Sequence, residues 1–533
     1  MAEGDWDYVI VGAGSAGCVL ANRLTANGKH RVLLLEAGGS DRHPYIWAPA
    51  GFLKTFRDAR FNWCFETEPG EGVDGRAIHF PRGRVLGGSS AINGHLYVRG
   101  QAQDFDQWAQ LGNRGWSYAD VLPYFRRSED RSTGEDNFHG SGGPQHVSDI
   151  HDRHPICEAF IDGAAELGLP TRHDYNGAHQ EGVTYYQRTI RNGRRASAAT
   201  SFLRPAMRRG NLKVVTHAMV LGLEIRGSRV TGLRYRHGDQ THTVRPAHET
   251  ILAAGAIGSP HLLQISGIGD PAHLQDIGIA VQHELPGVGA SLQDHFAARV
   301  VNRVSQPVTL NERAHGPRLW WEIAKWLVTG KGLLAFSPAH VAGFVRSRPE
   351  LDLPDLQLVF TPASYSDGVT GTLQETPGMT AGFWQLRPES KGHVRARTPH
   401  AIDAPAIQPN YLTTETDRQA AIAGVRWCRA LLETRAMAGY RAEETAPGSQ
   451  ADSDADILAH VRSTGATVYH AIGTCRMGSD PLAVVDDRLR LHGLDGLRVM
   501  DASVMPTMPS ANTNAATLMI AEKGADLILD HEG

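Results

Sequence analysis

One stretch, residues 7–38, constrains the fold of this chain more than any other. An apolar run at 7–11, rich in β-branched residues, has the length of a buried strand, and a helix-compatible stretch follows it. Between the two lies the glycine-rich string GAGSAG at 12–17, and a second strand-like run ends in Glu36. Strand, glycine turn, helix, strand and acid in this order are typical of a βαβ unit that binds a dinucleotide.

Each part of this motif has a physical role. Gly12 permits the tight turn, Gly14 lets the backbone approach a pyrophosphate, and Gly17 lets the helix lie close to the strand. The free N–H groups at the helix start face the phosphates, and Glu36 can accept hydrogen bonds from a ribose. A glycine turn of another α/β protein is the alternative, but the flanking strands and the acid favour a dinucleotide. The acid argues against NADP, while FAD and NAD both stay open.

Length and composition predict a soluble globular protein of several structural units. The chain has 533 residues, of which 41% are hydrophobic and 21% charged, and its formal charge of −4 indicates no nucleic-acid-binding surface. Five widely spaced cysteines without a CxxC motif predict a reduced, cytoplasmic protein with no metal site. The first strand starts close to Met1 and no apolar run reaches ~18 residues, so we expect neither a signal peptide nor a transmembrane segment. Peripheral membrane contact stays open.

Three later segments share the style of the first. The small residues of PRGRVLGGSSAING at 81–94 favour close backbone approach to a ligand over a flexible loop, because apolar residues follow at once. An apolar run, a small-residue turn and a helix at 249–266 form another junction of the kind that lines the crevice of a doubly wound sheet. A strand ending in Asp501 precedes a helix for which Asn512 is a suitable N-cap.

The remaining segments differ in character and predict a second domain. Strand-like runs from about residue 211 to 245 indicate hairpins, and short strands followed by long helices between 300 and 460 suit a substrate-facing domain. We therefore predict an α/β fold that joins a doubly wound, Rossmann-like dinucleotide domain to a mixed-sheet domain with helices. The first domain comprises residues 1–155, 195–299 and 465–533, and the second comprises 156–194 and 300–464.

Four ordered blocks spanning the chain resemble the glucose-methanol-choline (GMC) family of FAD-dependent oxidoreductases. The blocks are VIVGAGSAGCVLANRL, PRGRVLGGSSAINGHLYVRGQAQDFDQW, GAIGSPHLLQISGIG and the C-terminal YHAIGTCRMG with VMDASVMPTMPSANTNAATLMIAEK. The chain is most similar to the bacterial choline and aliphatic-alcohol dehydrogenases of that family. This resemblance, and not the glycine motif, implies FAD as the cofactor and an alcohol as the substrate.

The resemblance also implies the catalytic residues. His470 matches the base that removes the hydroxyl proton of the alcohol, and Asn514, 44 residues later, matches the histidine or asparagine that holds the substrate oxygen. Hydride then passes from the α-carbon to the flavin N5 atom. A histidine with an ordinary pKa near 6.5 is largely neutral, and so able to accept a proton, around pH 7. The helix that starts near Asn514 would face the flavin's pyrimidine side and stabilise the reduced ring.

Further positions carry the family's cofactor contacts by the same comparison. Ser89, Asn93, Gly94 and the backbone of Leu96 would contact FAD. Trp63 lies near the cofactor by the resemblance, although a core role is the alternative. Val220 would meet the adenine, and Asp501 with Ala502 the pyrophosphate or ribityl region; the remaining expected contacts are Ser15, Ala16, Ala37, Gly87, Ala254 and Thr513.

Three departures from the family pattern refine the expectation. Ile92 stands where some choline oxidases carry a flavin-linked histidine, so the resemblance implies non-covalent FAD. Ser291 replaces the asparagine of the family string GxNLQDH, which leaves the contribution of that loop open. His340 stands where choline-accepting relatives often have a glutamate, which disfavours choline because a quaternary ammonium needs a carboxylate or an aromatic cage. A packing role for His340 is the alternative.

The sequence thus predicts oxidation of a primary, neutral alcohol to an aldehyde, with electrons passing to O2 or to a quinone or other respiratory component. Two alternatives on the same scaffold are a choline dehydrogenase-like activity and a non-redox reaction of the hydroxynitrile lyase type. A non-catalytic flavin-binding or partner-binding protein is a further class, against which His470 and Asn514 argue.

Overall fold

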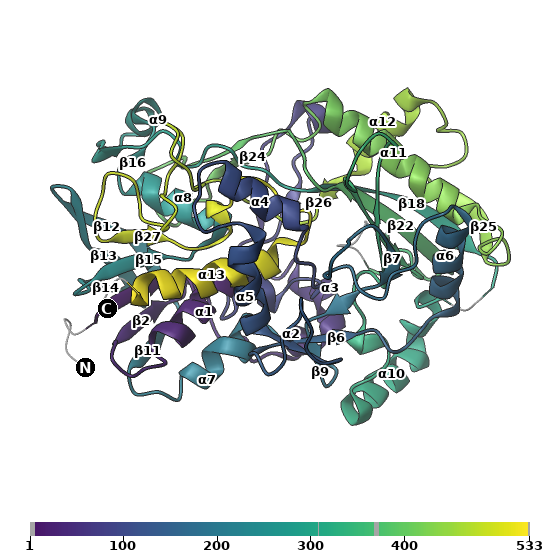
Figure 1. Cartoon of the computed structure of the whole chain (residues 1–533), viewed down its shortest axis with the longest axis horizontal. Helices are drawn as coiled ribbons and strands as arrows, with labels where there is room; N and C mark the ends of the chain where they lie inside the picture. The colour runs from purple at the N-terminus through teal and green to yellow at the C-terminus, as the bar shows by residue number, and fades with distance from the viewer. Residues whose placement is uncertain (1–5, 307–308, 367–371, 531–533) are drawn as a thin grey trace.

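The computed structural model describes residues 6–306, 309–366 and 372–530, and it is organised around two sheets that lie side by side (Figure 1). A parallel sheet occupies one half, and both chain ends lie at that end of the molecule. An antiparallel sheet covered by helices occupies the other half. The arrangement confirms the predicted α/β class, in which a doubly wound domain adjoins a mixed domain.

The parallel sheet has the strand order β11-β2-β1-β15-β27. Every residue of β1 and β2 is buried, which is why these strands read as continuous apolar runs in the sequence. The strands come from three distant parts of the chain, and two helices at the ends of the chain, α1 and α13, pack against each other beside them. The bounds are β1 Tyr8–Val11, β2 Val32–Leu35, β11 Leu212–Val215, β15 Glu249–Leu252, β27 Leu497–Val499, α1 Ser15–Leu24 and α13 Thr513–Leu529.

The region from 211 to 245 departs in part from its prediction. Its first strand, β11, is no hairpin arm but pairs in parallel with β2, with Val214 opposite Leu34. The three strands that follow, β12 Ala218–Arg226, β13 Arg229–His237 and β14 Gln240–Val244, form the predicted antiparallel hairpins. A four-residue strand carries no signal that distinguishes the edge of a parallel sheet from a hairpin arm, so the sequence pattern assigned β11 to the wrong sheet.

The second sheet has the order β25-β18-β22-β20-β19-β7, and β26 also pairs with β18. One face packs against α6, α11 and α12, where Phe160 stacks on Phe360 with ring centroids 4.2 Å apart. Its strands alternate between faces: Phe383 belongs to that helix-covered core, whereas Trp384 lines the opposite side. The bounds are β7 Gly182–Tyr185, β18 Phe296–Val304, β19 Val341–Val345, β20 Leu356–Thr361, β22 Gly378–Gln385, β25 Arg441–Ala446, β26 Ala466–Thr467, α6 Pro155–Glu166, α11 Glu415–Leu432 and α12 Asp454–Thr464.

The other elements complete the two halves. Residues 104–125, which are rich in aromatic side chains, contribute to α4 and α5, and Phe105, Trp108 and Phe125 are buried. The bounds are α2 Pro44–Trp47, α3 Phe52–Thr55, α4 Ala102–Gln110, α5 Tyr118–Ser128, α7 Arg204–Ala206, α8 Gly255–Ile265, α9 Pro271–Asp276, α10 Gly316–Thr329, β3 Phe65–Glu66, β4 His79–Phe80, β5 Glu129–Arg131, β6 Gln145–Asp149, β8 Gln187–Arg188, β9 Ile190–Arg191, β10 Arg194–Arg195, β16 Ile268–Gly269, β17 His283–Glu284, β23 His393–Arg395 and β24 Ala406–Gln408.

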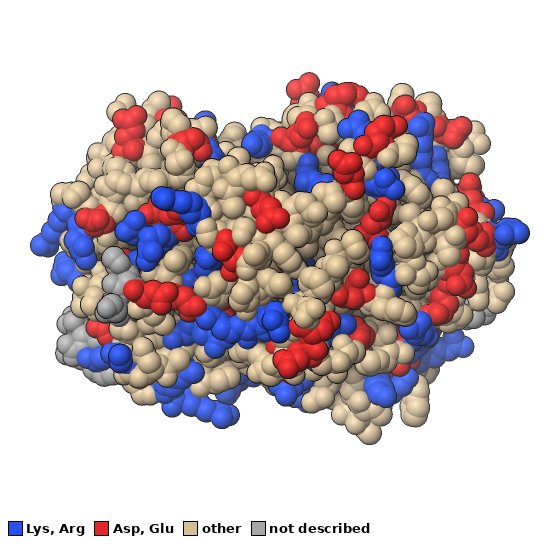
Figure 2. Space-filling model, in the orientation of Figure 1, with Lys and Arg blue, Asp and Glu red and all other residues tan. Residues whose placement is uncertain are grey.

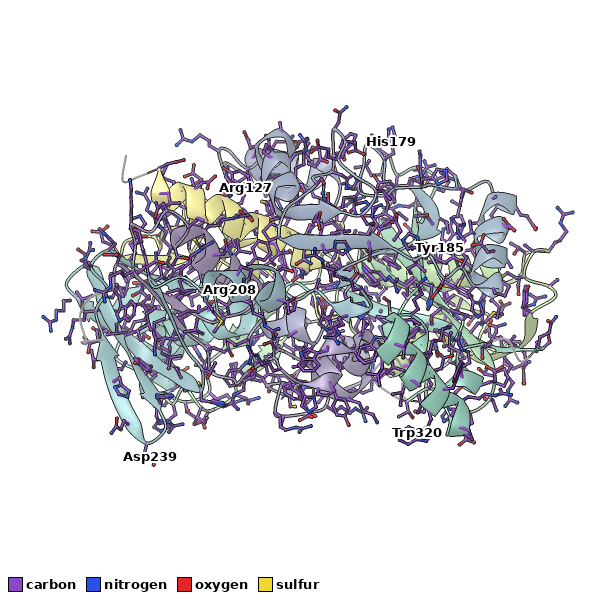
Figure 3. All side chains as sticks on the ribbon, turned by 90° about the horizontal axis from the view of Figure 1, so that it is seen from below. Arg127, His179, Tyr185, Arg208, Asp239 and Trp320 are labelled. Carbon is purple, nitrogen blue, oxygen red and sulfur yellow. The ribbon has the colours of Figure 1, made fainter. Side chains whose placement is uncertain are left out.

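A buried carboxylate fixes the C-terminal helix. Glu522 of α13 is fully buried and accepts hydrogen bonds from Arg23, Arg127 and Ser128 at 2.7–2.9 Å. Arg127 lies directly beside α13 in Figure 3. Because a buried charge is tolerated only when it is paired and hydrogen-bonded, this cluster locks α1, α5 and α13 in one arrangement. It thereby sets the position of the N-terminus of α13.

A second buried cluster joins β5 to the loop that follows it. Arg99 and Glu129 form an ion pair at 2.6 Å, with both side chains almost fully buried. His139 bonds to Glu129 at 2.9 Å through Nδ1 and to Asp174 at 3.0 Å through Nε2. Burial opposes protonation of His139, but the hydrogen bonds to Asp174 and Glu129 outweigh it and raise its pKa to about 9.

The surface carries charges of both signs. In Figure 2 Lys and Arg side chains are interspersed with Asp and Glu over the face in view, in agreement with the small formal charge. None of the described helices is both long and apolar enough to cross a membrane.

Candidate active site

A long cavity runs between the two sheets. Its lining extends from Glu36 and Val220 at one end to His470 and Asn512 at the other, and it encloses about 2370 Å³ of unfilled space, open solvent included. The residues that follow β1, β2, β15 and β27 all contribute to its wall. These are the carboxyl ends of parallel strands, where ligands bind in doubly wound sheets.

The glycine turn meets a second small-residue segment with backbone against backbone. Gly12 has φ +98°, and a Cβ there would lie 2.6 Å from the carbonyl oxygen of Ala253. A Cβ on Gly88 would lie 2.7 Å from Cα of Gly14. Close packing of the two turns thus accounts for glycine at position 88, since a side chain there would meet Gly14, and the predicted approach of residues 81–94 to a ligand stays a prediction.

Two predicted contacts serve the packing of this turn and do not line the cavity. A Cβ on Gly17 would lie 1.9 Å from the carbonyl oxygen of Gly12, so only glycine lets α1 lie this close to the turn. The N–H of Gly87 donates to the carbonyl of Ala13 at 2.7 Å. Neither Gly17 nor Gly87 lines the cavity, so the structure gives these two glycines a packing role, and their contact with a cofactor stays a prediction.

Glu36 is held at the cavity wall by two backbone donors. Its carboxylate accepts the N–H of Ala13 at 2.9 Å and that of Gly38 at 2.8 Å. Burial raises its pKa to about 7, although these two N–H groups pull in the opposite direction. The side chain therefore sits beside the glycine turn, as a ribose-binding acid would.

The other predicted contacts come together around the same cavity. Asp501, at the far side of the sheet, is buried and accepts the N–H of Gly255 at 2.8 Å and the hydroxyl of Ser259, so it also fixes the start of α8. The predicted residues that line the cavity are Gly12, Gly14, Ser15, Ala16, Glu36, Ala37, Trp63, Ser89, Asn93, Gly94, Leu96, Val220, Ala254, His470, Asp501, Ala502, Thr513 and Asn514.

Unpartnered polar atoms in the wall show that the cavity suits a polar ligand. Arg82 Nε and Nη2, His261 Nε2 and Trp384 Nε1 are buried, have no hydrogen-bond partner among the described residues and belong to lining residues. Buried donors and acceptors in proteins are nearly always paired. A dinucleotide carries phosphate, ribose and ring atoms along its whole length, so the lining fits FAD.

The backbone of His470 is clamped by a buried carboxylate. One oxygen of Asp294 accepts the N–H of His470 at 2.6 Å, and the other accepts the hydroxyls of Tyr411 and Thr467. Tyr469, directly before the histidine, has φ +70°, a conformation that costs energy for a non-glycine residue. The clamp therefore holds a strained backbone that turns the His470 ring towards the cavity.

A second histidine determines which nitrogen of His470 carries the proton. His295 Nε2 lies 2.8 Å from the carbonyl oxygen of Leu386, and because a carbonyl only accepts, this nitrogen must carry a hydrogen. In a neutral ring His295 Nδ1 is then an acceptor. It lies 2.9 Å from His470 Nδ1, which must donate to it. His470 Nε2 therefore carries no hydrogen and presents its lone pair at the cavity wall.

Both rings are neutral near pH 7. Burial lowers the pKa of His295 to about 4. Burial also lowers the pKa of His470 well below 6.5, and the neighbouring His295 and Arg82 add to the effect. His470 Nε2 is consequently a proton acceptor over a wide pH range.

Asn512 completes the catalytic end. Its Nδ2 donates to His470 Nε2 at 3.0 Å, and its Oδ1 accepts from Gln357 Nε2 at 3.3 Å. Gln357 Nε2 also donates to the hydroxyl of Tyr186 at 2.7 Å, which fixes the amide of Gln357. Asn512 occupies the N-cap position of α13 but makes no side-chain cap bond. Its side chain serves the site instead.

This geometry corrects the predicted partner of His470. We predicted Asn514, yet Asn514 Oδ1 accepts from the hydroxyl of Ser15 at 2.7 Å, beside the glycine motif. The asparagine that touches His470 is Asn512, two residues earlier. At the start of a helix the chain turns by about 100° per residue, so two residues change the direction of a side chain completely.

His340 also differs from its expected place. It is not a cavity residue, although its neighbours Pro338 and Ala339 are. Its ring lies 5.4 Å from that of Phe336, and burial lowers its pKa to about 3. His340 therefore packs behind the wall and does not take the place of an ammonium-binding acid.

The wall around His470 is aromatic and cationic. Among the lining residues, Trp384 lies with its ring 5.9 Å from that of His470, and Phe56 packs on Tyr469 at 5.1 Å. Arg82 lies near His470 and Arg299 near Tyr469. The acidic residues among the described lining are Glu36, Asp403 and Asp501; Glu36 and Asp501 belong to the nucleotide end, and Asp403 lies near His261 of α8.

Fold and site together define a dinucleotide-dependent oxidoreductase with a histidine at the reacting end of the cavity. Family models of the GMC oxidoreductases match residues 6–297 and 388–521. The chain belongs to this family, and it is accordingly an FAD-dependent oxidoreductase that acts on CH–OH donors.

Similar proteins span almost the full chain. The mitochondrial choline dehydrogenase of Homo sapiens is 43% identical, over 98% of this chain and 90% of that protein. The alcohol dehydrogenase (acceptor) of Pseudomonas putida is 38% identical, over 98% and 96%. Among solved structures, pyridoxine 4-oxidase from Mesorbium loti has a TM-score of 0.89 at 33% identity, with 99% of each chain covered.

Sequence reasoning missed the residues that position or flank His470 and Asn512 without belonging to a recognised motif. His295 lies in the family string GASLQDH, but nothing in that string shows that its ring reaches His470. Gln357 and Trp384 lie on neighbouring strands of the second sheet and had no motif to mark them. For His295, the signal that the sequence offered was a histidine directly after an acid, Asp294.

Proposed function

We propose that this protein oxidises a primary, uncharged alcohol to the aldehyde, with His470 as the base and Asn512 as the group that orients the hydroxyl. The observation that carries the proposal is the pairing of a neutral His470 Nε2 with an amide N–H at 3.0 Å at the cavity wall. A substrate hydroxyl that displaces this hydrogen bond can donate to the imidazole and accept from the amide, so both groups then hold the same oxygen.

The chemistry follows from this arrangement. His470 Nε2 takes the hydroxyl proton, and the Asn512 N–H stabilises the negative charge that develops on the oxygen. An alkoxide gives up hydride far more readily than an alcohol does. FAD, when bound, supplies the hydride acceptor. The positive end of α13, which begins at Thr513 in the cavity wall, favours negative charge nearby.

The cofactor is proposed to be dissociable. Ile92 lines the cavity at the position where the sequence comparison places a flavin-linked histidine in some relatives. An isoleucine side chain has no nucleophilic atom and forms no bond to the flavin. Acid precipitation of the purified protein should release all yellow colour into the supernatant; colour retained in the pellet would contradict non-covalent binding.

Choline is the second candidate substrate. The 43% identity to a choline dehydrogenase favours it, and the aromatic rings beside His470 could hold a quaternary ammonium. Two arginines in the same wall, Arg82 and Arg299, oppose a cationic substrate by like-charge repulsion. The described lining has no carboxylate of its own at that end, and the buried Asp294 near Arg82 lies behind the wall, so we favour the uncharged substrate.

A matched pair of alcohols separates the two candidates. Choline and 3,3-dimethylbutan-1-ol have the same shape and differ in charge. With the FAD-loaded protein under anaerobic conditions, we expect the neutral alcohol to bleach the flavin at least ~10-fold faster per unit concentration than choline does. Faster bleaching by choline would establish the choline activity instead, and no bleaching by any primary alcohol would favour a lyase or a non-catalytic role.

Two additions complete the experiment. His470→Gln should keep the yellow colour and lower the rate of flavin reduction by roughly 10²-fold or more. Admission of air after reduction then distinguishes rapid use of O2 from dependence on a quinone or another respiratory acceptor, which are the two classes of acceptor we propose.

A further inference from the structure

Helix α10 presents an apolar face to solvent. Trp320, Trp321, Leu327 and Val328 are 73%, 69%, 67% and 85% exposed. The spacing of these positions and of the exposed Ala324 between them places them on one side of the helix. Figure 3 shows Trp320 at the outer edge of the molecule, on the side of α10 away from the body. Surface helices normally turn their apolar side inwards, so this orientation needs an explanation.

The inner side of α10 is firmly held. Trp326 Nε1 donates to the carbonyl of Gly193 at 2.7 Å, and Glu322 accepts from Arg313 at 2.8 Å and from the N–H of Leu333 at 2.9 Å. The helix is thus anchored through Trp326 and a buried acid. Its exposed tryptophans are not misplaced core residues.

The charges around the apolar face are cationic. Arg318 and Lys331 are exposed at its two ends, and Lys325 is half-exposed between them. The neighbouring strands β9 and β10, joined to α10 through Gly193, add the exposed Arg191 and Arg194. Glu322, the acid of the helix, points inwards and is paired. The lower edge of Figure 2, where α10 lies in Figure 1, is mostly tan with blue atoms.

We propose that α10 docks onto an anionic lipid bilayer surface and lies in its interface. Tryptophans and aliphatic side chains on one face, with lysine and arginine around them, are the composition of interfacial helices. Anionic headgroups attract the cations, while the face enters the boundary of the acyl region. A second copy of the chain fits less well, because a two-fold contact would bring these cations against themselves.

Docking would place the membrane beside the reacting end of the cavity. Leu319, on the inner side of α10, packs against the cluster that contains Phe56 and is joined by Tyr469. Phe56 and Tyr469 both line the cavity. An apolar alcohol or acceptor dissolved in lipid would then reach the site by a short path. The docking itself does not depend on the reaction proposed above.

The test measures vesicle binding of the full FAD-loaded chain. We expect co-flotation with vesicles of phosphatidylcholine containing phosphatidylglycerol, weaker binding to phosphatidylcholine alone, and loss of binding at high salt. The double variant Trp320→Ser/Trp321→Ser should lower the partition coefficient at least ~10-fold. The matched control is Met207→Ser/Leu482→Ser, which removes two other exposed apolar side chains, 47% and 44% exposed, and should bind as the parent does.

A charge variant keeps the test independent of the tryptophans. Arg318→Glu/Lys331→Glu should abolish the preference for anionic vesicles while the flavin spectrum and thermal unfolding stay unchanged. Equal binding by the parent and the tryptophan variant would overturn the proposal. So would a lipid-free dimer that dissociates in the tryptophan variant, since a second copy would then be the occupant.

Discussion

Replacement of His295 tests whether the protein fixes the tautomer of its base. His295→Ala removes the acceptor that lies 2.9 Å from His470 Nδ1 and leaves a buried N–H without a partner. The ring of His470 is then free to carry its proton on Nε2, where it blocks the lone pair that must accept the substrate proton. His295→Gln is the matched variant, because its carbonyl oxygen can accept from His470 and its amide can donate to Leu386.

The magnitude follows from the cost of the lost bond. A buried hydrogen bond that loses one partner costs about 1–3 kcal/mol. If that energy is what favours the competent tautomer, His295→Ala slows the chemical step by roughly 5–150-fold. Substrate affinity should change little, because His295 lies behind His470 and is not itself a cavity residue. His295→Gln should recover most of the rate.

Two measurements show whether His295 controls the rate of flavin reduction and the tautomer of His470. Anaerobic stopped-flow gives the limiting rate of flavin reduction and the apparent substrate dissociation constant separately. The ¹⁵N chemical shifts of the His470 ring report which nitrogen carries the proton, a readout that a merely structural role of His295 would not move. The reasoning fails if His295→Ala reduces its flavin as fast as the parent, or if the alanine and glutamine variants are equally slow.

Three further outcomes follow from the same structure. Asn512→Ala should slow flavin reduction by at least ~10-fold more than Asn514→Ala does, since only Asn512 touches the base; the reverse order in stopped-flow would restore Asn514 as the partner. Because the pKa of His470 lies well below 6.5, the neutral base persists as pH falls through 6.5, and the reduction rate should stay flat from about pH 8 to pH 6; a midpoint near 6.5 would contradict this. His139 has a folded pKa raised to about 9, so its contribution to stability is fully present below about pH 6.5 and lost as pH rises through 9. His139→Gln should then cost on the order of 3 kcal/mol at pH 6 and little at pH 10 in urea titrations, and equal losses at both pH values would refute the linkage.

The nucleotide-binding half was predictable because its signals are local. The strand, turn and helix around Gly12, Gly14 and Gly17 are encoded within a few residues, and the structure shows a steric reason for glycine at Gly12 and Gly17. The strand before Gly255 and the helix after it were found in the same way. Apolar runs of this kind identify parallel strands because both of their faces are buried.

The catalytic end was less predictable because its contacts join distant parts of the chain. His295 and His470 are 175 residues apart, and no spacing rule brings them together. Asn512 had a sufficient local explanation as an N-cap, and the true role of its side chain appears only once Gln357 and His470 are in place. Whether His340 lines the cavity depends on its position relative to the start of β19, where a shift of one residue reverses the side that a side chain faces.

The loop that holds the base also begins a strand of the substrate-side sheet. Asp294 fixes the main chain of His470, His295 fixes its ring, and β18 starts at the very next residue, Phe296. His470 is therefore attached to the sheet that forms the substrate side of the cavity. It keeps its position relative to that sheet even when the two halves of the molecule move slightly relative to each other. Substitutions further along β18, such as at Arg299, could retune which alcohols enter while the proton acceptor keeps its place relative to them. Substrate selectivity and proton removal therefore depend on the same sheet, so β18 is the natural place to begin a redesign of substrate selectivity.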